Sequence, residues 1–391
     1  MHYLKDRKIL VGVTGSIAAY KALELVSRLK QLGAEVRVVM TQNAEQFVTP
    51  LSFATLSQNE VLTNTFTDPL AHIALAKWPE LILIAPATAN IMAKYAHGFG
   101  DDLLTTILLA TTAKVAIAPA MNQAMWAHPA VQENYAKLQA RNVDFIGPAA
   151  GLQACGDVGL GRMAEVDDII NVLPKYFQPQ ILAGKKVVIT AGPTQEPLDP
   201  VRYLTNYSSG KMGYALAASC YYHGAEVILI SGPTGLKAPA GCGLIKVTTA
   251  QEMQAQVLAQ ADADIIIGCA AVCDFKAQDY QSHKIKKSGD LNLNLALNED
   301  IMATLGKQKH KAMLIGFAAE TENLIENAKK KLQNKKLDMI IANPVGDGVG
   351  FNQDEQEIFV ITVKDTVHLP KQAKAMLADQ IIGQLFVAVL H

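Results

Sequence analysis

The sequence has little of what marks membrane-bound or nucleic-acid-binding proteins. Only 18% of its 391 residues are charged, and 35 basic against 36 acidic side chains leave a net charge of -1. A chain without a basic excess has no global attraction to nucleic acid or to an anionic membrane. No stretch approaches 18 uninterrupted apolar residues, the length that a membrane-spanning helix needs. We therefore expect neither nucleic acid nor a membrane as a partner, and anionic ligands must be bound locally.

Cysteine is also scarce, and its pattern excludes a disulfide scaffold. The five cysteines are Cys155, Cys220, Cys242, Cys269 and Cys273, an odd number spread along a long chain. Small secreted domains instead carry a dense, even set. The apolar run that follows the basic N-terminal residues spans only 9–13, which is too short for a signal peptide. These features predict a cytoplasmic protein.

Half of the residues are hydrophobic, and the length predicts two or three domains. Buried strands alternate with amphipathic helices, the pattern of a parallel α/β fold. The pattern restarts near residue 184: the segments QLGAEVRVVM and YHGAEVILIS, which end at Met40 and Ser231, both lead from a helix into a second strand. We predict two doubly wound domains, at 1–180 and 185–391. Strands are expected at 8–13, 35–40, 81–85, 114–118, 186–190, 226–230, 263–267, 312–317 and 337–341, with a hairpin-like tail around 357–363. Helices are expected from 18, after 88, from 101, over 129–141, and from about 210, 250, 299 and 322.

Short polar groups follow the strands of the first half. Ligands of open parallel sheets bind beyond the carboxyl ends of the strands, so these positions are candidates for a site. The first strand ends in GVTGSIAAYK (12–21), where a glycine turn opens a helix whose amides can face a phosphate. Alone, such a turn is more often an ordinary strand-to-helix connection, and it is not the GxGxxG of dinucleotide-binding folds. Later strands lead into Thr41, APATAN (85–90) and APAMNQAMW (118–126).

Three motifs together carry a resemblance to a family. The segments DPLAHIALAKW (68–78), PAMNQAMW (119–126) and ACGDVGLGRM (154–163) resemble those of the flavin-dependent phosphopantothenoylcysteine decarboxylases, over residues 7–178. The resemblance implies a flavodoxin-like sheet that binds FMN at subunit contacts. It places FMN against Gly15, Ser16, Ile17, Thr41, Thr88, Ala89, Asn90, Ile91 and Ala120.

The same resemblance implies three catalytic residues. His72 is the acid–base group, a role that histidine commonly has in enzymes that work near neutral pH. Asn122 holds the substrate carboxylate, and Cys155 donates a proton from a glycine-rich flap. Outside these motifs the ordinary interpretations are a structural histidine, a helix N-cap at Asn122 and a buried, inert thiol. The motif context favours function, and the glycines around Cys155 argue against its burial.

The second half has its own set of motifs. TAGPTQEPLDPVRYLTNYSSGKMG (190–213) joins a glycine turn to a second polar loop, and its SSGK is not a Walker P-loop. With GCAAVCDF (268–275), KIKK (284–287) and GFAAET (316–321), it resembles the phosphopantothenate:cysteine ligase family over roughly 185–391. The order of the two halves matches bifunctional enzymes of bacterial coenzyme A synthesis. On that resemblance the chain couples 4'-phosphopantothenate to L-cysteine and then decarboxylates the product to 4'-phosphopantetheine.

The ligase resemblance implies activation of a carboxylate by CTP, through an acyl-cytidylate and with release of pyrophosphate. Lys284 then compensates charge at the acyl phosphate, and Asn206 binds that intermediate. Mg²⁺ is implied by the triphosphate, and the sequence identifies no ligand for it. Lys331 and Lys335 lie four residues apart and share a helix face. The resemblance places the nucleotide against Gly268, Cys269, Ala270, Asp274, Lys284, Glu299, Asp300, Ile301, Met302, Phe317, Lys331 and Lys335.

Two other functions are considered. In one of them, the chain is a non-catalytic, flavin-binding regulatory subunit. The presence of His72, Asn122 and Cys155 disfavours this function. The other is a two-domain NAD-dependent oxidoreductase, which the absence of GxGxxG disfavours. Cys269 and Cys273, four residues apart, lack the further ligands of a zinc site and are interpreted as small strand-end residues. By analogy with trimeric decarboxylases and dimeric ligases, we expect a homo-oligomer that closes as a dodecamer.

Overall fold

The computed structural model describes residues 2–65, 70–260, 262–287, 291–308, 311–346 and 353–390. The chain divides into two compact units, Met1–Gln178 and Pro179–His391. The division falls at the start of the segment that the sequence indicated as the join, 179–184. Asp68 and Pro69, the first two residues of the motif at 68–78, lie outside the described residues.

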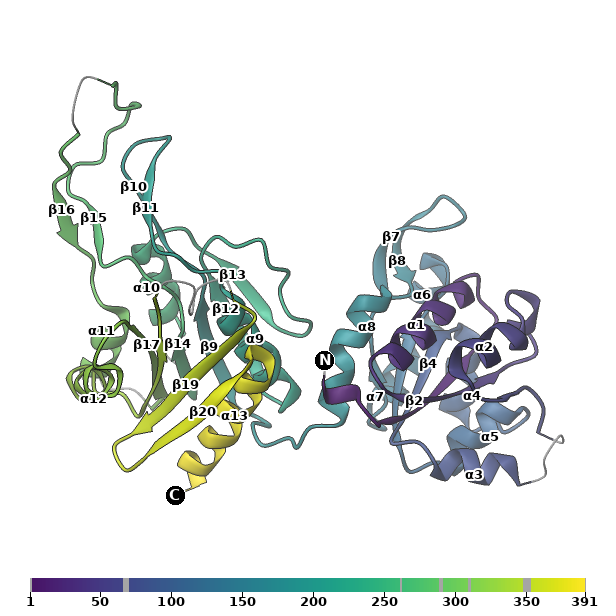
Figure 1. Ribbon diagram of the computed structural model, residues 1–391. Helices are drawn as coiled ribbons and strands as arrows, with labels where there is room; N and C mark the ends of the chain where they lie inside the picture. The colour runs from purple at the N-terminus through teal and green to yellow at the C-terminus, as the bar shows by residue number, and fades with distance from the viewer. Residues whose placement is uncertain are drawn as a thin grey trace. The chain divides into compact units, whose positions relative to one another are not determined.

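The first unit is built on a six-stranded parallel sheet (Figure 1). Its order is β3-β2-β1-β4-β5-β6. The edge strand β3 has only two residues, and without it the order is the 2-1-3-4-5 of flavodoxin-like folds. The predicted fold class is confirmed. The strands are β1 (Lys8–Val13), β2 (Glu35–Met40), β3 (Val61–Leu62), β4 (Leu81–Ala87), β5 (Lys114–Pro119) and β6 (Asp144–Phe145).

Helices return the chain between these strands. They are α1 (Ala19–Gln31), α2 (Pro50–Ser57), α3 (Ala71–Lys77), α4 (Ala89–His97), α5 (Leu103–Ala110), α6 (Gln123–Ala127), α7 (Pro129–Gln139) and α8 (Val166–Val172). The helix expected from 101 begins two residues later, because Asp102 forms a capping box with Thr105. The glycine-rich segment folds as an antiparallel hairpin of β7 (Ala149–Leu152) and β8 (Val158–Arg162).

The second unit contains an eight-stranded sheet in the order β13-β12-β9-β14-β17-β18-β19-β20. The first six strands are parallel and follow the 3-2-1-4-5-6 order of Rossmann-like folds. The predicted hairpin tail forms β19 and β20, which extend the sheet in antiparallel fashion. The strands are β9 (Lys186–Ala191), β12 (Glu226–Ser231), β13 (Gly243–Lys246), β14 (Ile265–Gly268), β17 (Met313–Glu320), β18 (Met339–Pro344), β19 (Glu355–Thr362) and β20 (Thr366–Ala373).

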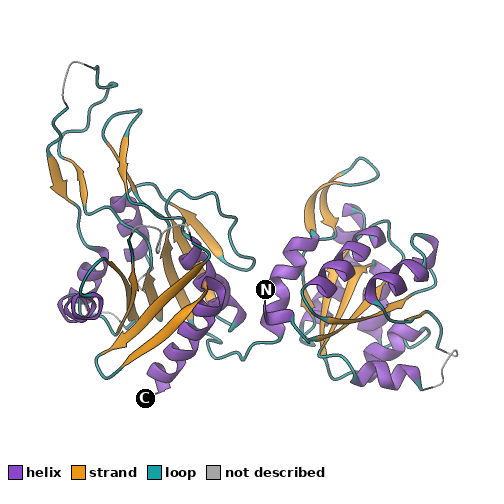
Figure 2. Ribbon diagram, viewed as in Figure 1, coloured by secondary structure: helices purple, strands orange, loops and turns teal. Residues whose placement is uncertain are grey.

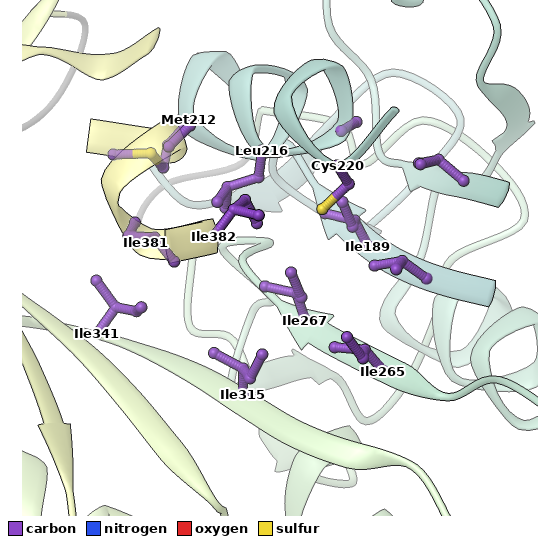
Figure 3. Close-up of a cluster of buried hydrophobic side chains, with 14 of the residues drawn as sticks. Ile189, Met212, Leu216, Cys220, Ile265, Ile267, Ile315, Ile341, Ile381 and Ile382 are labelled. Carbon is purple, nitrogen blue, oxygen red and sulfur yellow. The ribbon is translucent and has the colours of Figure 1, made fainter. Parts of the chain in front are cut away.

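Helices cover both faces of this sheet because its strands bury side chains on both sides. Ile189 lies beside Cys220 of α9 (Lys211–Tyr222), in a buried cluster that also contains Leu216 and, from the C-terminal helix α13 (Lys374–Leu390), Ile382 (Figure 3). Its neighbour Val188 packs on the other face with Met253. Burying a side chain of this size contributes about 1.5–3 kcal/mol. The helices are α9 (Lys211–Tyr222), α10 (Ala250–Leu258), α11 (Ile301–Lys307), α12 (Leu324–Asn334) and α13 (Lys374–Leu390), the last of which the sequence analysis missed.

Two small hairpins project from this unit (Figure 2). One joins β10 (Gln195–Pro197) to β11 (Tyr203–Thr205), and the other joins β15 (Phe275–Ala277) to β16 (Leu295–Leu297). Within the described ranges, no helix of either unit has both the length and the apolar character needed to cross a bilayer.

Candidate active sites

The first site lies where the strand order of the first unit reverses, between β1 and β4. Thr14 follows β1, and its hydroxyl donates to the carbonyl of Pro86 at 2.8 Å. The same hydroxyl oxygen accepts from the amide of Thr88 at 3.1 Å. Thr88 in turn caps α4, because its side chain accepts from the amide of Ile91. The strand ends are thus held together at the crevice where doubly wound sheets bind ligands.

The residues assigned to FMN all follow strands of this sheet on its carboxyl edge. Gly15, Ser16 and Ile17 follow β1, Thr41 follows β2, Thr88–Ile91 follows β4, and Ala120 follows β5. A Cβ atom on Gly15 would lie 2.5 Å from the Cβ atom of Asn43, so the two loops approach too closely for a larger residue. Ile17 is 62% exposed. The edge offers small residues and main-chain amides, which fits a flat, phosphorylated ligand.

Asn122 and Cys155, which lie far apart in the sequence, meet at this unit's flap. The side-chain nitrogen of Asn122 lies 3.3 Å from the Cys155 sulfur, 3.2 Å from Gln153 Oε1 and 2.9 Å from Asp157 Oδ2. An amide has two hydrogens, so three acceptors compete for them. Asn122 also accepts from the amide of Ala124 at 2.8 Å as the N-cap of α6. Asn122 is therefore an N-cap, and its amide nitrogen still faces the flap, while its assigned role toward the substrate stays a prediction.

The flap is the turn of the β7–β8 hairpin, residues 153–157. Cys155 is exposed there, as the surrounding glycines predicted. Hydrogen bonds from Asn122 and then Cys155 hold the pKa of Asp157 below its ordinary value. Sequence reasoning missed Gln153 and Asp157, although both lie within two residues of the cysteine that it singled out.

His72 lies in the first turn of α3 and is half-buried. Its Nδ1 atom is buried and has no hydrogen-bond partner within the part of the chain that is described. A buried polar atom of this kind calls for a ligand or a partner group. Asn122 and Cys155 are in contact, whereas no hydrogen bond between described residues joins His72 to either of them.

The second site is a cavity of about 490 Å³ at the carboxyl edge of the second sheet. Asn206 lines it, as do Ser208–Lys211 at the start of α9. All the residues assigned to the nucleotide except Lys284 line it as well: Gly268, Cys269, Ala270, Asp274, Glu299, Asp300, Ile301, Met302, Phe317, Lys331 and Lys335. Here too the site forms where the strand order reverses, between β9 and β14.

Hydrogen bonds between the two strand ends shape this cavity. The amide of Ala270 donates to the Thr190 hydroxyl at 3.2 Å, and the amide of Ala271 donates to the carbonyl of Gly192 at 2.9 Å. The Asn206 side chain donates to the carbonyl of Val272 at 3.0 Å, which fixes its amide against the wall. Predicted residues from three separate loops thereby reach one cavity.

Lys331 and Lys335 both line the cavity, and each pairs with a carboxylate. Lys331 Nζ lies 2.6 Å from Glu320 Oε1, and Lys335 Nζ lies 2.7 Å from Asp300 Oδ2. Burial alone would raise the pKa of Asp300, but the hydrogen bond from Lys335 and main-chain amides outweigh it and lower the pKa. An anionic ligand must therefore compete with these carboxylates for the two ammonium groups.

Lys284 is not among the residues that line the cavity. It is exposed and lies in the segment between β15 and β16. Its assigned role stays a prediction.

Both halves of the chain match known families. Residues 2–178 match the family described as Flavoprotein, and residues 182–388 match the DNA/pantothenate metabolism flavoprotein C-terminal domain. The coenzyme A biosynthesis bifunctional protein CoaBC of Vibrio vulnificus (strain CMCP6) is 46% identical, with 100% of each chain covered. The protein of the same name from Bacillus subtilis (strain 168) is 47% identical, with 98% of this chain and 97% of the relative covered. The chain belongs to the family of CoaBC bifunctional proteins.

Membership confirms the recognition made from the motifs and the prediction of a bifunctional enzyme of coenzyme A biosynthesis with ligase and decarboxylase activities. The flavoprotein match also confirms a flavin as cofactor. The match over both halves contradicts the two other functions considered, the NAD-dependent oxidoreductase and the non-catalytic regulatory subunit. A solved C-terminal domain of a CoaBC protein is 39% identical, with 54% of this chain and 98% of that chain covered and a TM-score of 0.47.

The sequence analysis did not assign every polar residue of the ligase cavity, and Asn343, Gln356 and Lys374 are among those that it missed. Asn343 is the next-to-last residue of β18, where the strand-end rule would have found it. Gln356 and Lys374 come from the antiparallel extension and the start of α13, to which that rule does not apply. Lys374 is 8% exposed, and its ammonium donates to the carbonyl of Gln353 at 2.6 Å. Burial, and then the nearby Lys211, lower the pKa of Lys374.

No cluster of three or more candidate metal ligands occurs among the described residues, which include Cys269 and Cys273. Burial raises the pKa of Cys269 to about 12 and also raises that of Cys273. The Cys273 amide donates to the Thr194 hydroxyl at 2.9 Å, which agrees with a packing role at the strand end.

Proposed function

We propose that residues 1–180 carry the FMN-dependent decarboxylation and that residues 185–391 carry the CTP-dependent ligation, with the ligation first. The observation that carries this division is the difference in chemistry between the two sites. The first offers an amide, an exposed thiol and small loops, and the second offers lysines around a cavity. A thiol and an amide suit proton transfer to a neutral product, whereas lysines suit a triphosphate.

In the first site, FMN when bound would supply a reversible two-electron couple: it would accept two electrons, which creates the electron sink that loss of CO2 from an unactivated cysteine carboxylate requires, and would return them to the product. The strand-end loops at Gly15–Ile17, Thr41, Thr88–Ile91 and Ala120 would hold it. Asn122 binds the substrate carboxylate with an amide hydrogen that Gln153, Asp157 and the Cys155 sulfur share when no substrate is bound. Cys155 then donates the proton that completes the product from the enethiol, and His72 accepts or donates the proton of the other half-reaction.

In the second site, the carboxylate of 4'-phosphopantothenate attacks the α-phosphorus of CTP, and pyrophosphate leaves. The amine of L-cysteine then attacks the acyl carbon, and CMP leaves. The transition states of both steps carry extra negative charge, which fixed cations stabilise. Lys331 and Lys335 line the cavity and would exchange their carboxylate partners for phosphate oxygens. Lys284 neutralises the acyl phosphate beside Asn206. Mg²⁺ accompanies CTP and keeps water and phosphate oxygens as ligands, so no protein ligand is assigned.

We further propose a cytoplasmic homo-oligomer, a dodecamer built from trimeric contacts of the first unit and dimeric contacts of the second. Large apolar side chains on the first unit support this: Leu51 is 75% exposed and Leu70 is 72% exposed. Such exposure suits a subunit contact better than a solvent-facing surface. Light scattering coupled to gel filtration tests it, and a monomeric mass would refute it.

Mass spectrometry of the FMN-loaded protein tests the two activities together. The protein is incubated with 4'-phosphopantothenate, L-cysteine and Mg²⁺, with either CTP or ATP. Formation of 4'-phosphopantetheine with CTP is expected. Accumulation of 4'-phosphopantothenoylcysteine would overturn the assignment of the first site, and absence of any product would overturn both.

A further inference from the structure

The segment that carries Lys284 is attached to the β10–β11 hairpin through the residue next to it, Ile285. The main-chain amide of Ile285 donates to Asp199 Oδ2 at 3.1 Å. The carbonyl of Ile285 accepts from the Arg202 side chain at 3.2 Å. Both main-chain polar groups of this residue are therefore held by side chains of the other hairpin, although most of its neighbours are exposed.

Asp199 is suited to hold this attachment because its own position is fixed. It is 2% exposed, and its Oδ1 atom accepts from the amides of Val201 and Arg202 at 2.7 and 2.8 Å. Arg202 Nη1 lies 3.4 Å from Oδ2. Burial would raise the pKa of Asp199, but the amides of Val201, Ile285 and Arg202 outweigh this and lower it. A charged acceptor held by several donors is rigid, and it strengthens each bond that it accepts.

A second contact supports the same arrangement: the amide of Gln281 donates to the carbonyl of Leu198 at 3.0 Å. The segment is thus attached at 281 and 285, on either side of Lys284. Removing the Gln281 contact alone would leave Lys284 tethered at its nearer neighbour. The contact to Ile285 therefore decides where the lysine backbone lies.

We propose that Asp199 is a positioning residue of the ligase reaction, which orients Lys284 by anchoring the main chain of Ile285. The inference rests on the proposed role of Lys284. Asp199 touches no reacting atom and acts only through the lysine. Ordering a long side chain on an exposed segment costs less conformational entropy when its backbone is already fixed.

Asp199→Asn separates this contact from the turn that Asp199 also caps. The amide oxygen of asparagine can still accept from Val201 and Arg202, but its NH2 group would then face the Ile285 amide, donor against donor. Asp279→Asn is the matched control, because Asp279 is exposed in the same segment and its side chain makes no hydrogen bond among the described residues. If Asp199→Asn does not fold, Asp199→Ser keeps one acceptor for the turn and is too short to reach Ile285.

The experiment is a double-mutant cycle on ligase turnover with Asp199→Asn, Lys284→Gln and both together, in the full-length chain. We expect Asp199→Asn to lower kcat by about tenfold or more, as a misplaced catalytic group does. The double variant should be within about twofold of Lys284→Gln alone, because nothing remains to position. Decarboxylation of added 4'-phosphopantothenoylcysteine, and ligation by Asp279→Asn, should be unchanged.

Two results would overturn the inference in different ways. Asp199 does not act through Lys284 if the losses in kcat caused by the two substitutions multiply in the double variant. The same conclusion holds if the kcat of Asp199→Asn is within twofold of that of the unmodified chain. In both cases the role of Lys284 itself stands. If Lys284→Gln itself keeps full turnover, the proposed role of Lys284 fails, and the inference fails with it.

Discussion

Gly161 couples the flap to the loop that carries Asn122, and its substitution should disable only the first site. Gly161 lies on β8 with a φ of 144°, which L side chains rarely adopt. Its carbonyl accepts from the amide of Met121 at 2.8 Å. A Cβ atom there would overlap the Met121 carbonyl oxygen and lie 2.8 Å from Gln153 Nε2. Gly161→Ala therefore forces the hairpin, together with Gln153, Cys155 and Asp157 in its turn, away from the loop that carries Asn122.

The size of the expected loss in decarboxylase rate follows from the geometry. Relieving the overlap requires a shift of about 1 Å, and misplacement of that size costs about 100-fold in rate. The unfavourable φ adds about 1–3 kcal/mol of strain to the first unit. We expect decarboxylase kcat to fall about 100-fold while ligase turnover of the same molecules is unchanged. Release of CO2 from 4'-phosphopantothenoylcysteine measures the first quantity, and pyrophosphate release measures the second.

Gly156→Ala is the matched control in the same flap. Gly156 also has a positive φ, of 92°, but nothing lies within 4 Å of a Cβ built there. It should keep decarboxylase activity within about threefold, because a clash is absent and only local strain remains. The reasoning is refuted if Gly161→Ala is no slower than Gly156→Ala, or if its ligase activity falls in parallel.

Three other predictions follow from single contacts. Cys155→Ser replaces a thiol by a much weaker acid, so CO2 should still be released while the enethiol accumulates, which mass spectrometry detects; product formation at the normal rate would contradict the role of the thiol. Lys374→Met removes a buried ammonium from the ligase cavity and should weaken CTP binding by about tenfold or more in titration calorimetry, with unchanged affinity as the contrary result. The main-chain amide of Lys186 and the side chain of Lys185 lower the pKa of Asp264. This carboxylate therefore stabilises the second unit at pH values above its unfolded pKa of about 3.9, and the stabilisation is lost as pH falls through the lower folded pKa. Asp264→Asn should then lower the Tm of that unit at pH 7 and converge with the unmodified chain in acid, and an equal difference at all pH values would show that linkage is not the cause.

The strand-end rule predicted at which edge of each sheet the candidate site lies, because parallel strands bring their carboxyl ends to one edge regardless of sequence distance. Thr88 and Ala120 lie at that edge of the first sheet. Asn206, which the ligase resemblance supplied, lines the second cavity. The rule could not predict which groups would pair across that edge. The carboxylate partners of Lys331 and Lys335 lie at the end of β17 and at the N-cap of α11, and their approach to α12 depends on the register of the whole sheet.

Two omissions have different physical causes. Helix α13 carries buried Leu377, Ala378, Ile381 and Ile382 at the spacing of a helix face, so its signal was present in the sequence and was overlooked. The cavity position of Lys374 had no such signal, since it depends on an antiparallel extension that the parallel pattern does not require.

This extension also changes what counts as the ligase module. The six parallel strands from β13 to β18 already form a complete nucleotide-binding topology, and a boundary drawn from sheet order would end the module at β18. Gln356 and Lys374, beyond that point, nevertheless line the cavity. The smallest piece of chain that can retain the site therefore extends past the strands that complete this topology, at least to Lys374. A truncation there would remove a wall of the active site together with helix α13, whose Ile381 and Ile382 belong to the buried core.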